Sequence, residues 1–193
     1  MRKLLLGGLL TTTLALSALA AAPAGAGTLA DVTMPDKIDI GGQALVLNGM
    51  GLRKKFVIKV YVAGLYLPAK ERSPAKILAA DAPRRMAFHF VFSVSAKQMC
   101  DAWEDGLADN TPNATAEVKA GFKALCGAME DIPKGHEMVL TYQPGQGTRV
   151  EVNGKVKATI PGKPVSDAVL ATWIGPHPDP GEDFKQAMLG APR

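Results

Sequence analysis

Residues 137 to 160 constrain the fold most, because three runs typical of β-strands follow one another there with very short turns between them. The runs are Glu137–Gln143, Gly147–Val152 and Lys155–Ile160. The last two are separated only by Asn153-Gly154, a strong signal for a two-residue type I′ hairpin. Strands joined by turns this short must run antiparallel. The sequence therefore predicts an antiparallel meander in this part of the chain.

Further strand signals precede the meander. Lys37–Ile40 and Gln43–Leu47 flank a pair of glycines, which commonly closes a hairpin. Phe56–Leu67 and Met86–Val94 are rich in β-branched and aromatic residues, and we expect both to be strands. Gly64 lies inside the first of them, which indicates a bulge or the close approach of another segment to the backbone.

Two helices are predicted between the strand groups, because apolar residues recur there at the helical period. The two stripes are Ala96, Met99, Cys100, Trp103 and Leu107, and then Val118, Phe122, Leu125, Cys126 and Met129. Ser95 is a suitable N-cap for the first helix. Two shorter helices, Pro164–Trp173 and Gly181–Leu189, are expected near the end of the chain. This order predicts an α+β fold, in which helices cover one side of an antiparallel sheet.

The N-terminus has the pattern of a secretory signal peptide. Arg2 and Lys3 precede the apolar run Leu4–Ala22, and Ala24-Gly25-Ala26 supplies small residues for cleavage. We expect residues 1–26 to be removed after Ala26, which leaves one domain, residues 27–193, in the periplasm or outside the cell, with no stable transmembrane segment. The alternative is a retained membrane anchor, since the apolar run approaches spanning length.

The overall charge argues against a nucleic-acid-binding protein. The formal charge of +4 includes Arg2 and Lys3, so residues 27–193 carry 20 basic against 18 acidic residues, a formal charge of +2. No basic run is longer than Arg53-Lys54-Lys55. A nucleic-acid surface needs a basic patch, and none is predicted.

Cysteines and histidines give no sign of a metal site. The three histidines show no ligand spacing relative to Cys100 and Cys126, and we expect neither a metal nor a cofactor. Each cysteine lies on the apolar stripe of its own predicted helix, which leaves two readings open: two buried thiols, or one disulfide between the helices. No G-x-S-x-G, P-loop, H-E-x-x-H or C-x-x-C motif is present.

Two segments resemble the chalcone isomerase family. Residues 49–67, GMGLRKKFVIKVYVAGLYL, are similar to its glycine–arginine hairpin, in which G-x-G-x-R precedes a strand that ends in glycine, an apolar residue, tyrosine and leucine. Residues 163–185, KPVSDAVLATWIGPHPDPGEDFK, resemble its C-terminal S-x-A-V-L-x-T-x-I-G segment. The resemblance implies an open-faced β-sandwich, a large antiparallel sheet with a helical layer and a cleft between them.

The same resemblance implies a set of site residues. Arg53 falls on the cleft arginine, which in the isomerases stabilises a phenolate, and Thr172 falls on the C-terminal threonine. Trp173 replaces a smaller apolar residue, Arg85 lies near the position of a family lysine, and Tyr61 stands where the isomerases have a threonine. The catalytic tyrosine and asparagine of the isomerases have no clear counterpart.

These departures favour a binding protein over an enzyme. We expect a small amphipathic ligand such as a fatty acid, its carboxylate held by Arg53 and Tyr61 and its chain in an apolar tunnel. Thr172, Trp173 and Arg85 would be polar or flanking neighbours. Two alternatives stay open. One is an intramolecular lyase or isomerase acting on a chalcone-like or other enone, with Arg53 as its catalytic residue. The other is a structural or interaction protein of the cell envelope.

Overall fold

The computed structural model describes residues 26–191, so the predicted signal peptide lies outside the described residues apart from Ala26. Nine strands and five helices follow one another along this part of the chain. They are β1 (Ala26–Leu29), β2 (Val32–Pro35), β3 (Lys37–Ile40), β4 (Gln43–Lys55), β5 (Ile58–Leu67), α1 (Pro74–Ala79), β6 (Arg84–Phe90), α2 (Ala96–Asn110), α3 (Ala116–Gly127), β7 (Glu137–Gln143), β8 (Gly147–Val152), β9 (Lys155–Ile160), α4 (Lys163–Ile174) and α5 (Glu182–Met188).

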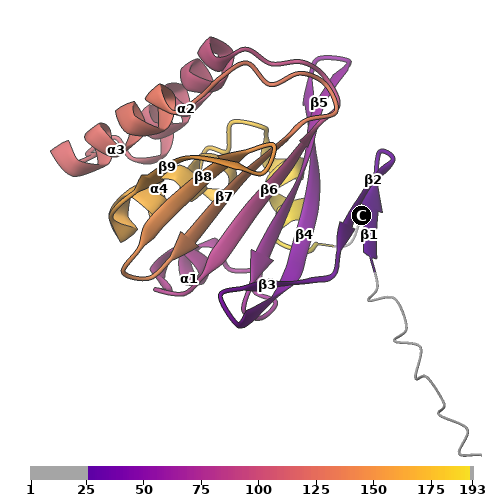
Figure 1. Ribbon diagram of the computed structural model, residues 1–193, viewed down its shortest axis with the longest axis horizontal. Coiled ribbons are helices and arrows are strands. Elements are labelled where there is room, and N and C mark those ends of the chain that lie inside the picture. The colour runs from indigo at the N-terminus through magenta and orange to yellow at the C-terminus, as the bar shows by residue number, and fades with distance from the viewer. Residues whose placement is uncertain (1–25, 192–193) are drawn as a thin grey trace, which may run out of the picture.

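Strands β3 to β9 form one sheet in which the spatial order is the order of the chain (Figure 1). Every neighbouring pair is antiparallel. This is the arrangement that short turns between consecutive strands dictate. The predicted meander is confirmed, since β7, β8 and β9 have the bounds expected from the sequence.

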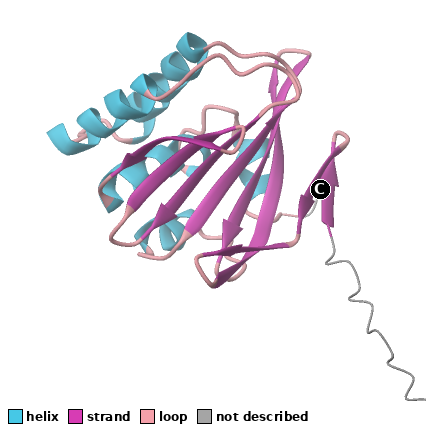
Figure 2. Ribbon diagram, viewed as in Figure 1, coloured by secondary structure: helices cyan, strands magenta, loops and turns pink. Residues whose placement is uncertain are grey.

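Helices cover one face of the sheet, and the small β1–β2 hairpin packs on the other (Figure 2). Successive side chains of β5 point to opposite faces of the sheet and so belong to two separate cores. Tyr61, Ala63 and Leu65 belong to the core under the helices, whereas Val62 and Tyr66 belong to the core that β2 completes. The predicted α+β fold, an open-faced β-sandwich with an antiparallel sheet and a helical layer, is confirmed.

Strand β4 is longer than the predicted run Gln43–Leu47, because it continues through Gly49 and Gly51, and the chain turns only at Phe56 and Val57. A Cβ on Gly49 would lie 2.6 Å from the carbonyl oxygen of Met188, and one on Gly51 would lie 2.7 Å from the Phe184 ring. The two glycines therefore allow α5 to pack directly on β4.

The N-cap predicted for the first long helix is confirmed. Ser95 accepts a hydrogen bond from the Gln98 amide and completes a capping box at the start of α2. The short helix α1 and the β1–β2 hairpin were not predicted. The strand expected to reach Val94 ends at Phe90. No helix among residues 26–191 is long and apolar enough to cross a membrane.

Cys100 and Cys126 are both free thiols in the structure, each partly buried on its helix. Burial, together with a hydrogen-bonding contact with Cys100, raises the pKa of the Cys126 thiol to about 12. The thiols thus lie side by side between α2 and α3. Of the two sequence readings, the structure has the pair of unbridged thiols.

Candidate functional site

A pocket of about 480 Å³ opens between the β4–β5 hairpin, α2 and the C-terminal end of α4. Its volume lies within the ~300–1,000 Å³ typical of small-molecule sites. Much of its wall is apolar and comes from the strands and α2, with Val60, Phe92 and Met99 among the lining residues. Arg53 and Tyr61 contribute polar atoms.

Four of the five predicted ligand-binding residues line this pocket: Arg53, Tyr61, Thr172 and Trp173. They come from segments more than a hundred residues apart in the chain, because α4 packs across the face of the sheet to which Tyr61 belongs. The structure therefore brings together the two segments on which the family resemblance was based.

Arg53 is placed near the end of β4, where a register shift follows it. Its guanidinium forms an ion pair with Asp179, and the second contact of the pair, from Nη2 to Oδ1, measures 3.4 Å. The guanidinium carbon also lies 5.9 Å from the centre of the Tyr61 ring. The positive charge is thus held at the pocket by the aromatic ring and by an internal carboxylate.

The loop after α4 holds Asp179 in place. The backbone N–H of Asp179 donates to the carbonyl of Thr172 at 3.0 Å. The Asn110 side chain, at the end of α2, both donates to the His177 carbonyl and accepts from the His177 N–H, each at 2.8 Å. These contacts fix the loop to α2 and α4, so the Asp179 carboxylate is presented to Arg53 from a defined position.

Tyr61 is buried beside Arg53, and its phenolic oxygen accepts a hydrogen bond of 2.9 Å from the Trp173 indole. Burial raises the pKa of Tyr61 above its usual value, and this outweighs the opposite effect of Arg53. The phenol is therefore neutral at physiological pH. Because Trp173 uses an oxygen lone pair, the phenolic hydrogen remains able to donate to a ligand.

Trp103 is a pocket residue that the sequence reasoning assigned only to the core. It lines the pocket and is 2% exposed, yet its indole Nε1–H is buried without a hydrogen-bond partner among the described residues. Leaving a buried donor unpaired costs about 1–3 kcal/mol, so such groups commonly mark a site that a ligand or water completes. Nothing in the apolar stripe of α2 could have distinguished this tryptophan from a core residue.

Comparison with known proteins is consistent with this arrangement. The model of a family described as chalcone isomerase-like matches residues 26–190. The chain belongs to the chalcone isomerase-like family. A crystal structure of a fatty-acid binding protein from Arabidopsis thaliana is similar in fold, with a TM-score of 0.65 and 18% sequence identity over 86% of this chain and 96% of that one. A search of curated protein sequences gave no match.

In this chalcone isomerase-like chain, Arg85 does not reach the pocket. It lies on the opposite face of the sheet with Tyr66 and the β1–β2 hairpin, along a separate depression, and its Nε donates to Thr141 at 2.9 Å. The expectation that Arg85 stands near the mouth of the same cleft is wrong. Adjacent residues of a strand point to opposite faces, so the neighbouring Arg84 is the one that faces the helices.

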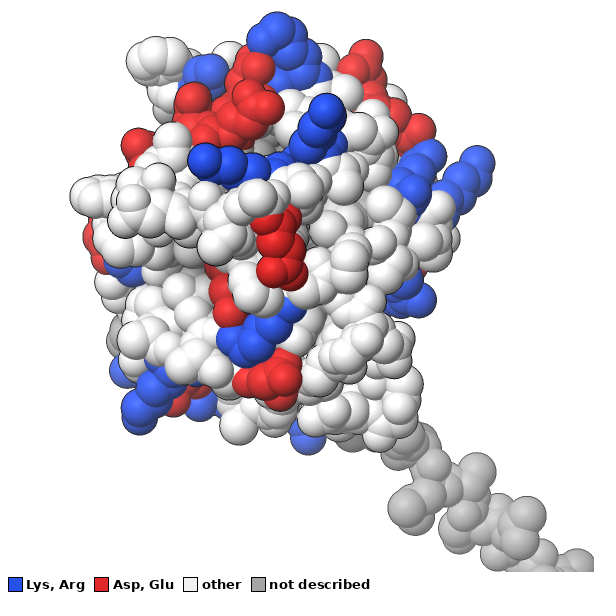
Figure 3. All heavy atoms as spheres, turned by 90° about the vertical axis from the view of Figure 1, so that its left-hand side faces the viewer, with Lys and Arg blue, Asp and Glu red and all other residues white. Residues whose placement is uncertain are grey.

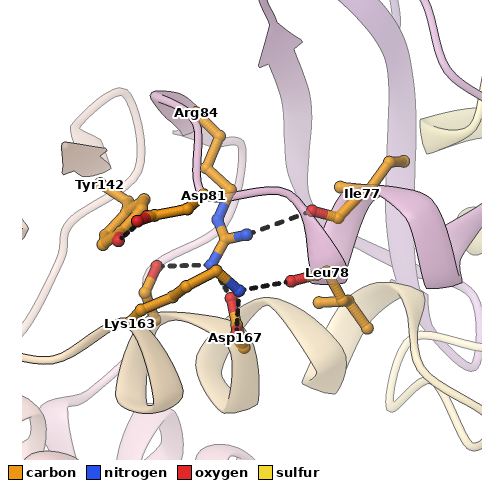
Figure 4. A network of polar contacts seen from close by, with 8 residues as sticks. Ile77, Leu78, Asp81, Arg84, Tyr142, Lys163 and Asp167 are labelled. Atoms are coloured by element: carbon orange, nitrogen blue, oxygen red, sulfur yellow. Dashed lines mark hydrogen bonds and ion pairs between the residues drawn. The ribbon is translucent and has the colours of Figure 1, made fainter. Parts of the chain in front are cut away.

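Arg84 is the centre of a buried polar network (Figure 4). Its guanidinium donates to the Ile77 carbonyl at 3.3 Å and to the Ser166 hydroxyl at 2.8 Å, and it forms an ion pair with Asp167. Lys163 bonds the same carboxylate at 2.6 Å. The cavity beside Arg84 measures only about 20 Å³, enough for one water at most. This network ties α1 and α4 to β6 and has no room for a ligand.

Charge around the pocket is mixed. Asp105, Asp109, Asp179 and Glu182 line a shallow depression that adjoins the pocket and shares two of these residues with it. Acidic and basic side chains are likewise interspersed on the face of the molecule shown in Figure 3. Among residues 26–191 no group of three histidine, cysteine, aspartate or glutamate side chains is arranged to hold a metal ion.

Proposed function

We propose that this chain binds a small amphipathic carboxylate, most simply a fatty acid, in the pocket between β4, β5, α2 and α4, and does not transform it. One observation carries the proposal: a cationic guanidinium and a neutral phenol, Arg53 and Tyr61, meet in a pocket that apolar side chains line together with Lys55, Asp101 and Asp105. This pairing suits a ligand with an anionic head and an apolar tail.

The residues around Arg53 can bind the carboxylate end of the ligand. The Arg53 guanidinium can bind a carboxylate through two N–H groups, once the Asp179 carboxylate is displaced. Tyr61 supplies a further donor, and Trp103, whose indole N–H has no partner among the described residues, also lines the pocket. The similarity in fold to the Arabidopsis fatty-acid binding protein supports a lipid as the ligand.

A lyase or isomerase acting on an enone is the second candidate. The same two donors, Arg53 and Tyr61, would stabilise an oxyanion as it develops. The neutral state of Tyr61 argues for a donor rather than a base, so the pocket favours binding over proton abstraction. Incubation with a chalcone, followed by its absorbance, tests this candidate, and cyclisation well above the spontaneous rate would establish it.

Binding is tested by titrating a fluorescent fatty acid into the purified protein. Arg53→Ala is expected to weaken the affinity by about 10- to 100-fold, because charged hydrogen bonds contribute roughly 1.5–3 kcal/mol. Arg85→Ala is the matched control, since it removes the same side chain from the other face of the sheet. Unchanged affinity in the Arg53 variant would exclude this ligand site. Mass spectrometry of an organic extract would identify lipid that co-purifies.

Export is part of the proposal. The signal-peptide pattern of residues 1–26 supports a periplasmic or secreted location, with cleavage after Ala26. The first strand begins at Ala26, so the described fold begins where the predicted leader ends. The intact mass of the protein recovered from the periplasm or the medium tests this. A mass that retains residues 1–26 would support a membrane anchor instead.

A further inference from the structure

The tip of the β4–β5 hairpin exposes large apolar side chains. Phe56 is 91% and Val57 is 93% exposed, and Ile58 and Phe92 beside them are 44% and 49% exposed. These four residues, the apolar tip, are four of the five large hydrophobic side chains that residues 26–191 expose. Single exposed apolar residues are ordinary, but a cluster of this kind marks an interaction site.

The backbone of the tip is also unusual. Phe56 has a φ of +55°, in the left-handed region where glycine or asparagine is normally found and where a bulky side chain is strained. Val57 follows it at the turn, and the strands pair on both sides, Lys55 opposite Ile58. A phenylalanine at this position gains no packing within the fold that would offset its strain.

Basic residues surround the apolar tip. Lys54, Lys55 and Lys59 are all exposed, and none of them forms an ion pair within the described part of the chain. No acidic residue occurs between positions 40 and 70. Exposed aromatic and aliphatic side chains next to unpaired lysines are the combination that binds the interface of an anionic membrane.

The apolar tip adjoins the mouth of the ligand pocket. Phe56, Ile58 and Phe92 line the pocket as well as the exposed surface, and so does Lys55. The hairpin projects at the top of Figure 1, at the same end of the molecule as α2. A surface that holds the tip would therefore lie directly against the pocket opening.

We infer that the β4–β5 hairpin docks this protein on an anionic lipid bilayer, with Phe56 and Val57 in the interface and Lys54, Lys55 and Lys59 against the head groups. The inference rests on the proposed function, since docking places the pocket where an amphipathic ligand can enter or leave the membrane. The four side chains of the apolar tip are too few for a standard protein–protein interface, which buries roughly 800 Å² per partner. A lipid surface needs only the few apolar side chains and the positive charge that the hairpin offers.

Co-sedimentation with vesicles tests the inference. The processed protein, its N-terminus checked by mass spectrometry, is mixed with vesicles of phosphatidylethanolamine and phosphatidylglycerol or with vesicles of phosphatidylcholine alone. We expect binding to the anionic vesicles only. The tip variant Val57→Ser changes the most exposed apolar side chain, which does not line the pocket, and should lower this binding about fivefold or more. Val156→Ser is the matched control, because Val156 is the fifth exposed apolar side chain and lies in β9.

A second pair of variants tests the charge. Lys54→Gln/Lys59→Gln should weaken binding to anionic vesicles more than about tenfold, since each lysine near such a surface contributes about fivefold. Lys119→Gln/Lys123→Gln removes the same charge from the exposed side of α3 and should have little effect. Lys55 stays unchanged because it lines the pocket.

Fatty-acid affinity, measured in the same variants without vesicles, separates this inference from the proposed function. Val57→Ser should retain fatty-acid binding, because Val57 does not line the pocket, whereas Arg53→Ala should lose it and still bind vesicles. Equal vesicle binding by the tip variant and the unaltered protein would overturn the docking surface. So would equal binding to neutral and anionic vesicles, or tip-dependent capture of another protein without any binding to vesicles.

Discussion

Asp179, in the loop that follows α4, forms an ion pair with Arg53 of β4 at the mouth of the pocket. An anionic ligand must displace this carboxylate before it can bind the guanidinium. The pair is partly exposed, with side-chain exposures of 16% and 27%, so its strength is about 0.2–1 kcal/mol. Asp179→Asn is therefore expected to raise fatty-acid affinity about two- to fivefold, measured by fluorescence titration.

Asp109→Asn is the control for this prediction. Asp109 lines the adjoining acidic depression but does not contact Arg53, so the variant removes the same charge without releasing the guanidinium. We expect a smaller gain in affinity from it. A lower affinity in Asp179→Asn would mean that Asp179 orients Arg53 for the ligand rather than competing with it.

Tyr61→Phe should destabilise the protein, because among residues 26–191 the Tyr61 hydroxyl is the only hydrogen-bond acceptor of the Trp173 indole. A buried donor left unpaired costs about 1–3 kcal/mol, and urea unfolding measures the loss. Tyr66→Phe removes a part-buried hydroxyl that donates to the Pro35 carbonyl and should cost less. Equal stability of Tyr61→Phe and the unaltered protein would mean that water replaces the lost acceptor.

The sequence predicted the sheet well for a physical reason. Short turns such as Asn153-Gly154 restrict strands to antiparallel neighbours, and period-2 or helical patterns report the local backbone. Both signals depend only on residues close together in the chain, so a single sequence is enough to detect them. The β1–β2 hairpin and α1 are too short to produce such a pattern, and their packing is what stabilises them.

The site was predicted only in part, because its remaining features depend on contacts between distant segments. The Arg53–Asp179 pair joins residues 126 positions apart. The unpaired state of the Trp103 indole depends on what surrounds it, which no periodicity records. Arg85 was assigned to the wrong face of the sheet, because similarity to the family places it only approximately along the strand. A shift of one residue moves a side chain to the opposite face.

Gly49→Ala and Gly127→Ala should affect stability in opposite directions. A Cβ at Gly49 would collide with the carbonyl oxygens of Ala187 and Met188, and backbone cannot move aside as a flexible side chain can. We expect a loss of about 3 kcal/mol or more, or no folding at all. Gly127 ends α3 with open space around it, so alanine there should be neutral or stabilise by up to about 1 kcal/mol.

Thermal unfolding of the two alanine variants checks this contrast. Because both substitutions add the same methyl group, the difference between them isolates the packing of α5 on β4. A Gly49→Ala variant with unchanged stability would show that α5 can move away from the strand at little cost. Its fatty-acid affinity would then report whether that movement disturbs the nearby pocket.

All three tyrosines of the chain should ionise late in the folded protein. Burial raises the pKa of Tyr61 and raises the pKa of Tyr66 to about 12. The pKa of Tyr142 is also raised to about 12, by burial together with a hydrogen bond of 2.5 Å to the Asp81 carboxylate. Unfolded tyrosines titrate near pH 10. Absorbance at 295 nm should therefore change little at pH 10 in the native protein, but should reach its midpoint there in guanidinium chloride. Because the folded state holds these protons more tightly, stability should be full below pH 10 and should fall as the pH rises from 10 towards 12. A native titration in which one third of the full amplitude has its midpoint near pH 10 would identify one tyrosine that water reaches.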